Sequence, residues 1–400
     1  MEYNFDEIID RRHTNSAKFD EMDALFGSDV MHLGVADMDY RSPEPILNAM
    51  QKIVKKGVFG YTILPDNYQD LVCQWMLRRY HEKIDPEWVV FSPRINMALN
   101  MVVETFTNPG DGIVLHTPAY TALQNAIEKY DRKMIESSLV LENGRYRMDF
   151  KQLREALDDN LKKGIHTSLM LLCNPHNPTG RVWNKGELDE IASICKDYNL
   201  MLVADEIHAD FAFQGKHQVF ANLKKEYEEM TIACTSPSKT FNLAGLQTSN
   251  IFIPNQKLKN AFKKQLDAAG YSQLNAAGLV ACEAAYRDGE EWYQTMKKYV
   301  AGNIAFTKEF VEKNLPGVNM VEHEGTYLVW LDFNGLGLCA QELEDLIVHK
   351  AKLWLDSGRI FGKCGRGFQR INVACPRSTL KEALERIAKV LPAETVKFAS

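Results

Sequence analysis

The chain has 400 residues, of which 45% are hydrophobic, and its 47 basic and 53 acidic residues give a net charge of −6. This length exceeds that of one ordinary domain, and the apolar content is enough for a large buried core. No basic block favours nucleic acid as a partner. No apolar run approaches the roughly 18 residues that a membrane-spanning helix needs. We therefore expect a globular protein that binds neither nucleic acid nor a membrane.

The first residues and the cysteines both indicate a cytoplasmic protein. The sequence MEYNFD at residues 1–6 is acidic and polar, unlike a signal peptide. The eight cysteines are scattered without C-x-x-C spacing, which favours reduced thiols. There is no H-E-x-x-H motif and no paired Cys/His spacing that would suggest a metal. The sequence thus predicts a cytoplasmic localisation and no metal.

The first 116 residues predict an arm, several helices and a strand. Residues 1–30 are polar with few periodic apolar positions, which is typical of an arm, and residues 30–39 begin like a strand and end polar. Helices are predicted over residues 44–56, over residues 67–81, and from the turn at 91–96 to residue 107. A strand is predicted over residues 112–116.

Strand and helix patterns then alternate to about residue 255, which indicates a mostly parallel sheet with helices on both faces. Asn184 and Glu187 predict a capping box at the start of a helix over residues 185–198. The expected fold class is α/β, with a large central domain over residues 45–290.

A smaller α+β domain is expected from both chain ends, residues 1–44 and 291–400. A long amphipathic pattern over residues 289–314 leads into it, and residues 325–331 predict a strand. Thr379 and Glu382 predict a capping box for a last helix over residues 380–391.

Three polar clusters follow three apolar runs. NPHNPTG at residues 174–180, DEIH at 205–208 and TSPSKT at 235–240 each begin where a buried strand is predicted to end. In α/β sheets the carboxyl ends of strands carry the ligand site. Lys239 on a turn can form a Schiff base with an aldehyde cofactor, and neighbouring serines can hold its phosphate. S-P-S-K alone would fit a surface turn, but the three clusters together favour a cofactor site.

These elements, N-P-x-N-P-T-G, D-x-x-(Y/H) and S-x-S-K, resemble in order and separation the fold-type I enzymes that use pyridoxal 5′-phosphate (PLP), the class I/II aminotransferase family. The resemblance covers nearly the whole chain. His208 stands where aminotransferases commonly carry tyrosine, and Gln247 stands where many carry the arginine of G-x-R. With the segment at residues 361–368, these features are similar to the MalY/PatB-like cystathionine β-lyase (C–S lyase) subgroup.

The resemblance implies PLP as the cofactor and a role for several residues around its ring. Asp205 is expected to pair with the pyridine nitrogen, although an aspartate here can also cap a helix. Asn177 is expected to donate to the 3′-oxygen and Tyr120 to stack on the ring. His208 is either a cofactor-binding or a structural residue, and its charge near pH 7 stays open.

The resemblance also implies a phosphate site, and helix N-termini bind phosphate well. The expected ligands are the first-turn residues Ile95 and Asn96, the hydroxyls of Ser236 and Ser238, and Tyr61 from a neighbouring subunit. A tyrosine that reaches across in this way implies a homodimer with a shared active site.

Arg370, in the sequence GFQRINVACP, is expected to bind the α-carboxylate of an amino-acid substrate through its planar guanidinium. Arg366 and Arg359 are competing candidates in Gly-rich surroundings. The segment that contains Ala36 resembles the one that lines the substrate pocket in this family.

The implied activity is PLP-dependent α,β-elimination from cystathionine or a related cysteine S-conjugate, with Lys239 as the catalytic base, to give a thiol, pyruvate and ammonia. The first steps are shared with transamination, so an aminotransferase is the alternative. A PLP-binding regulatory protein without turnover is a third possibility, which the presence of Lys239, Asp205 and Arg370 disfavours.

Overall fold

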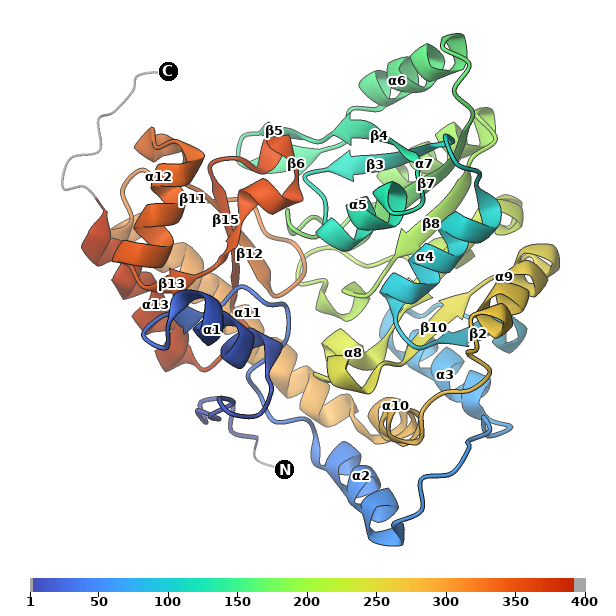
Figure 1. Ribbon diagram of the computed structural model, residues 1–400, viewed down its shortest axis with the longest axis horizontal. Helices are drawn as coiled ribbons and strands as arrows, with labels where there is room; N and C mark the ends of the chain where they lie inside the picture. Colours follow the sequence, from blue (N-terminus) through green and yellow to red (C-terminus); the bar gives the residue numbers. More distant parts are fainter. Residues whose placement is uncertain (1–2, 392–400) are drawn as a thin grey trace.

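The computed structural model describes residues 3–391 and contains two main β-sheets flanked by helices (Figure 1). The outermost parts of the predicted arm and of the predicted C-terminal domain, residues 1–2 and 392–400, lie outside the described residues. The larger sheet has seven strands in the order β2 (Val89–Ser92), β10 (Ser249–Phe252), β9 (Thr231–Thr235), β8 (Met201–Asp205), β7 (Thr167–Cys173), β3 (Gly112–Thr117) and β4 (Lys133–Ser138).

All neighbouring strands of this sheet are parallel except β10, which runs antiparallel to both β9 and β2. The prediction of an α/β fold with a mostly parallel sheet is therefore confirmed. In β7, Leu169 and Leu171 pack into one hydrophobic cluster, and Met170 and Leu172 pack into the other. A strand that is buried on both faces has to be apolar throughout, which explains the continuous apolar run.

Helices cover both faces of the seven-stranded sheet. One face packs against α4 (Ile95–Phe106), α5 (Thr121–Glu128) and α9 (Gln256–Ala268). The other face packs against α3 (Tyr68–Tyr80), α6 (Phe150–Lys162), α7 (Lys185–Asp197) and α10 (Ala276–Asp288). Helix α2 (Glu44–Lys56) lies against α10, and the long helix α11 (Glu290–Asn314) runs toward the second sheet (Figure 1).

The smaller sheet is antiparallel, in the order β11 (Asn319–Met320), β12 (Leu328–Asp332), β15 (Phe368–Asn372) and β14 (Asp356–Ser357). An N-terminal and a C-terminal segment also meet, because β1 (Met31–His32) pairs in parallel with β13 (Leu353–Trp354). The structure also contains a helical turn at Ala17–Glu21, α1 (Met22–Phe26), the hairpin β5 (Val140–Glu142) and β6 (Arg145–Arg147), α8 (Pro237–Thr240), α12 (Ala340–Glu344), α13 (Arg377–Val390) and several further short helical turns. The domain limits given above remain a prediction.

The two predicted capping boxes have different outcomes. At α7, the backbone N–H of Glu187 donates to Asn184 Oδ1 over 3.1 Å, and the N–H of Asn184 donates to Glu187 Oε2 over 2.9 Å, which confirms that box. The box predicted from Thr379 and Glu382 is wrong. Helix α13 begins at Arg377 with Pro376 as its N-cap, so Thr379 already lies within the first turn.

Proline explains the early start of α13, because its fixed φ suits the residue that flanks the helix and it needs no hydrogen-bond acceptor. The strand predicted over residues 325–331 also differs at its start, because β12 begins only at Leu328. Thr326 has a φ of 72°, a left-handed conformation that cannot belong to a strand. Within residues 3–391, no helix combines the length and the apolar character needed to cross a membrane.

Candidate active site

A cavity of about 160 Å³ lies at the carboxyl ends of β7, β8 and β9. All the predicted site residues line it except Tyr61 and Arg370. The predicted residues on its wall are Ala36, Ile95, Asn96, Tyr120, Asn177, Asp205, His208, Ser236, Ser238 and Lys239. The parallel strands thus bring together the three clusters, which are separated by about 30 residues each in the sequence.

Lys239 lies on the short helix α8, directly after β9. Ser236 caps this helix by accepting a 3.1 Å hydrogen bond from the backbone N–H of Ser238. The Lys239 amine donates to the carbonyl of Ala36. Burial, followed by the charge of Arg370, lowers the pKa of Lys239 to about 8, while Asp37 and Asp205 act in the opposite direction. A lysine with such a pKa is neutral more often near pH 7 and is a stronger candidate for a base or nucleophile.

Asp205 is the last residue of β8 and is 4% exposed. Its Oδ1 accepts a 3.2 Å hydrogen bond from the backbone N–H of Ile207. The alternative interpretation, a helix N-cap, is wrong, because His208 is the N-cap of the helical turn that follows, Ala209–Phe211. Burial raises the pKa of Asp205 to about 6. A positively charged partner, such as a protonated pyridine nitrogen, would stabilise the ionised form of this buried carboxyl.

His208 is 2% exposed, and its ring contacts the ring of Tyr327 edge-on, with centroids 5.8 Å apart. Burial is the largest of the causes that bring the pKa of His208 well below its ordinary value, and the charges of Lys239 and Arg370 add to it. The direction of this pKa shift favours a neutral imidazole at pH 7. Its Nδ1 is buried and has no hydrogen-bond partner within residues 3–391.

Arg370 lies on β15 of the smaller sheet and reaches the wall of the cavity. Its Nη1 donates to Asn177 Oδ1 over 2.8 Å, and its Nη2 donates to the carbonyl of Gly34 over 3.1 Å and to Asp356. The buried Nε has no partner within the described part of the chain. Because the carbonyl oxygen of Asn177 accepts from Arg370, its amide nitrogen remains for donation to another group.

The two competing arginines lie elsewhere. Arg366 is exposed, and Arg359 pairs with Glu344 over 3.1 Å with half of its side chain exposed. Arg370, by contrast, is 2% exposed and touches a residue that lines the cavity. Of these three arginines, only Arg370 is thus buried against the wall of the cavity.

One end of the cavity is rich in hydrogen-bond donors. Ser236 and Ser238 lie with their hydroxyl oxygens 2.9 Å apart, and Ile95 and Asn96 form the first turn of α4. The N-cap of α4, Arg94, makes no capping hydrogen bond with its side chain, so the helix start presents backbone donors. Such a set of N–H and O–H groups suits a phosphate.

Two predicted aromatic residues differ in their position. Tyr120 is the N-cap of α5 and lines the cavity. Tyr61 is 97% exposed and does not line it, and its neighbours Val58, Phe59 and Ile63 are also exposed. A contact between Tyr61 and the phosphate therefore requires a second subunit, and that role stays a prediction.

Two residues that contact the site were missed by the sequence analysis. The hydroxyl of Tyr327 donates to the carbonyl of Ala36 over 3.0 Å, and Asp356 pairs with Arg370. Asp356 lies directly opposite Arg370 in the antiparallel register of β14 and β15. Only the pairing of these strands brings the two together, and no local sequence pattern could have indicated it.

These residues fit PLP, an aromatic aldehyde with a phosphate group. The cavity offers an amine with a lowered pKa at Lys239, a buried carboxyl at Asp205, and donors around Ser236 and the start of α4. The unpaired buried nitrogen of His208 is one more polar group that lacks a partner in the protein. Within residues 3–391 there is no cluster of His, Cys, Asp and Glu that could hold a metal ion.

Comparisons with known proteins cover almost the entire chain. The sequence model for aminotransferase class I and II matches residues 28–387. Cystathionine beta-lyase PatB of Bacillus subtilis is 38% identical over 390 residues, which are 97% of this chain and 100% of that protein. Cystalysin from Treponema denticola, whose crystal structure contains PLP, is 37% identical with a TM-score of 0.93, covering 98% of this chain and 99% of that one. A PLP-bound C–S lyase from Staphylococcus hominis is 32% identical with a TM-score of 0.90 over the same shares.

Proposed function

Because the chain belongs to the aminotransferase class I and II family, and its cofactor is PLP, we propose that it is a carbon–sulfur lyase acting on cystathionine or a related cysteine S-conjugate. In the proposed reaction the conjugate and one water give a thiol, pyruvate and ammonia. The full-length similarity to PatB carries this proposal.

The cofactor would be held from three sides. Lys239 would bind its aldehyde carbon, Asp205 would face its ring nitrogen, and Ser238 with the first turn of α4 would bind its phosphate, because the Ser236 hydroxyl already donates to the Thr248 carbonyl over 2.6 Å. When bound, PLP supplies an electron sink that stabilises the negative charge on the substrate Cα after its proton has left. An ionised Asp205 supports this, because it keeps the ring nitrogen protonated.

Arg370 would bind the substrate α-carboxylate. A guanidinium offers directed N–H donors to a carboxylate, whereas an ammonium offers a point charge. Asn177, Gly34 and Asp356 already fix the orientation of this guanidinium from its far atoms, Nη1 and Nη2. Its Nε–H remains as a donor for the carboxylate.

Lys239 would remove the Cα proton. The lowered pKa of Lys239 increases the fraction of neutral amine. The Ala36 carbonyl orients this amine by accepting a hydrogen bond from it. The electron pair of the broken Cα–H bond forms the Cα–Cβ double bond as the Cβ–S bond breaks. Sulfur leaves as a thiolate, which departs more readily than hydroxide or a carbon group.

Transamination is the alternative, since the family model carries the aminotransferase name and both reactions begin with loss of the Cα proton. The difference lies in whether a proton is delivered to the cofactor carbon before sulfur departs. Lys239 holds the Cα proton and could return it there, but a neutral His208 and an uncharged Gln247 in the cavity wall would not add a second proton source, which favours elimination.

A direct assay distinguishes a carbon–sulfur lyase from an aminotransferase and from a PLP-binding protein without turnover. We expect pyruvate, ammonia and thiol to form from L-cystathionine without any added keto acid, and faster than any amino acid reacts with 2-oxoglutarate. The Lys239→Ala variant supplies the background rate. Product formation that requires a keto acid, with the cofactor accumulating in its amine form, would replace the lyase by an aminotransferase. A lack of turnover with both substrate sets, despite bound PLP, would indicate a binding protein.

A further inference from the structure

The segment from Gly34 to Asp39 lies between β1 and α2 and contributes Ala36 to the wall of the active-site cavity. Its backbone carbonyls contact three site residues: Gly34 accepts from Arg370 over 3.1 Å, and Ala36 accepts from the Lys239 amine and, over 3.0 Å, from the Tyr327 hydroxyl. The segment belongs to no helix or strand. Its position is therefore set by hydrogen bonds and ion pairs to other parts of the chain.

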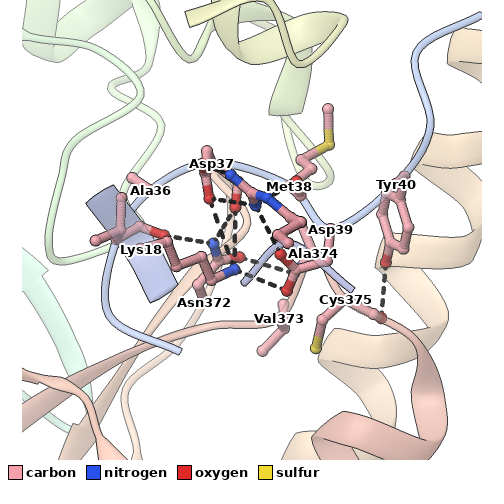
Figure 2. Close-up of polar contacts among 12 residues, drawn as sticks. Lys18, Ala36, Asp37, Met38, Asp39, Tyr40, Asn372, Val373, Ala374 and Cys375 are labelled. Carbon is pink, nitrogen blue, oxygen red and sulfur yellow. Dashed lines mark hydrogen bonds and ion pairs between the residues drawn. The ribbon is translucent and has the colours of Figure 1, made fainter. Parts of the chain in front are cut away.

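A buried set of charges lies on the other side of this segment. Lys18 is 1% exposed, and its amine lies 2.7 Å from Asp39 Oδ2 and 3.7 Å from Asp37 Oδ1 (Figure 2). Arg11 donates to Asp37 over 2.6 Å and to Asp39 over 2.9 Å. Two cations thus face two carboxylates, so each buried charge is compensated.

The amide of Asn372 completes the attachment. It donates to the carbonyls of Val35 over 2.8 Å and Asp37 over 2.6 Å, and the N–H of Asp39 donates to the carbonyl of Ala374 over 3.0 Å (Figure 2). Ala36 is therefore held between anchored neighbours on both sides. A shift of these anchors would move the carbonyl that contacts Lys239.

The part of the chain that carries Lys18 is itself ordered by local contacts. The carboxylate of Asp20 accepts from the backbone N–H groups of His13, Thr14 and Ser16 over 2.7 to 3.0 Å. The helical turn Ala17–Glu21 follows this loop and directs Lys18 inward. Lysine side chains are rarely buried unless they are paired, so the burial of Lys18 depends on its ion pairs with Asp37 and Asp39.

We propose that Lys18 and Asp39 are a positioning pair, which holds the Ala36 carbonyl against the Lys239 amine, so that the N-terminal arm orients the reactive group. Neither residue touches the cavity, and both act through the backbone of residues 36–39. The proposal rests on the proposed function only in taking Lys239 as the reactive amine.

The test uses the full-length variant Lys18→Met/Asp39→Asn, which removes one charge of each sign and leaves no unpaired carboxylate. Its matched control is Lys352→Met/Asp29→Asn, which makes the same replacements at an exposed ion pair, 3.0 Å long, between Asp29 of the arm and Lys352 beside β13. Lys18→Arg is the conservative variant. Two quantities are measured: the pH midpoint for acetylation of Lys239 in cofactor-free protein, read by peptide mass spectrometry, and kcat and KM of the PLP-loaded enzyme.

In Lys18→Met/Asp39→Asn, the acetylation midpoint should fall by about half a pH unit, because the amine loses an acceptor that favours its charged form. Misplacement of the amine should lower kcat by about tenfold. Lys18→Arg should stay within about twofold of the unaltered protein, as should the control. A variant that loses thermal stability but keeps the midpoint and kcat of the control would overturn the proposal.

Asp39→Glu serves if the double variant does not fold, because the added methylene displaces the segment while both charges remain. A changed midpoint in Asp39→Glu supports the positioning role, and an unchanged one overturns it. The acetylation assay needs no substrate. An unaltered protein that does not cleave cystathionine would therefore contradict the proposed function without affecting this test.

Discussion

Arg370 and Asn177 are 193 residues apart in the sequence, yet Arg370 Nη1 donates a 2.8 Å hydrogen bond to Asn177 Oδ1. The first residue lies on β15 of the smaller sheet, and the second follows β7 of the larger one. This bond connects the proposed substrate-carboxylate site to the proposed donor for the cofactor oxygen. It also sets which end of the Asn177 amide faces the cavity.

Replacement of Arg370 by lysine should weaken substrate binding more than it slows the chemical step. Loss of a charge-assisted hydrogen bond costs about 1.5–3 kcal/mol, so Arg370→Lys should raise KM by roughly 10- to 100-fold, with a smaller change in kcat. Steady-state kinetics with L-cystathionine measures both. Arg366→Lys and Arg359→Lys are the matched controls and should leave KM unchanged. A similar increase in all three variants would show that Arg370 has no special role.

Replacement of Lys239 should separate cofactor binding from catalysis. Lys239→Ala should lower kcat by about 10²- to 10⁴-fold, because the base is lost, while PLP is still bound through the phosphate site. Absorbance of the dialysed protein measures the bound cofactor. Borohydride treatment of the unaltered protein should fix the label on Lys239 in a peptide map. Lys259→Ala, at a buried lysine whose amine bonds to the Glu87 carbonyl, is the control and should retain activity. A label on another lysine would contradict the assignment.

Asp205 should favour catalysis but lower the free energy of unfolding of the cofactor-free protein. Its pKa is raised from 3.8 to about 6, so the native state binds more protons than the unfolded state between these pH values. The free energy of unfolding therefore falls as pH rises through this window, by about 3 kcal/mol in total at pH 7.

Asp205→Asn should thus raise the free energy of unfolding of the cofactor-free protein by roughly 1–3 kcal/mol at pH 7 and by almost nothing below pH 4. With PLP bound, kcat should fall by about 10²-fold or more, since the ring nitrogen loses its counter-charge. Urea denaturation at several pH values and steady-state kinetics test the two parts. The exposed Asp158→Asn should change neither. An unchanged kcat in Asp205→Asn would assign the nitrogen to another residue.

Tyr61 should contribute to the site of a second subunit, because it is 97% exposed in the single chain. Tyr61→Ala and Lys239→Ala should each have low activity alone. After equal mixing and subunit exchange, half of the dimers carry one complete site, so up to about a quarter of the original activity should return.

The control for this mixing experiment is Lys239→Ala combined with the double variant Tyr61→Ala/Lys239→Ala. No dimer in that mixture contains the lysine, and no activity should return. If exchange is verified and the first mixture also stays inactive, each subunit has a self-contained site.

The sequence by itself determined the α/β fold class and the place of the candidate site. Strands buried on both faces must be apolar throughout, so β7, β8 and β9 were visible as runs, and the polar clusters marked their ends. The capping box at Asn184 was equally predictable, because both of its hydrogen bonds join residues three positions apart. The box at Thr379 failed because Pro376 starts that helix earlier.

Only the tertiary structure decided the contacts between distant segments and the charge of the buried groups. The register of β14 and β15 places Asp356 opposite Arg370. The path of the arm brings Lys18 into an ion pair with Asp39. The neutral state of His208 follows from burial, which depends on what packs around it. Hydrogen bonds between near neighbours leave a pattern in the sequence, whereas solvation and long-range pairing depend on the positions of all surrounding chain segments.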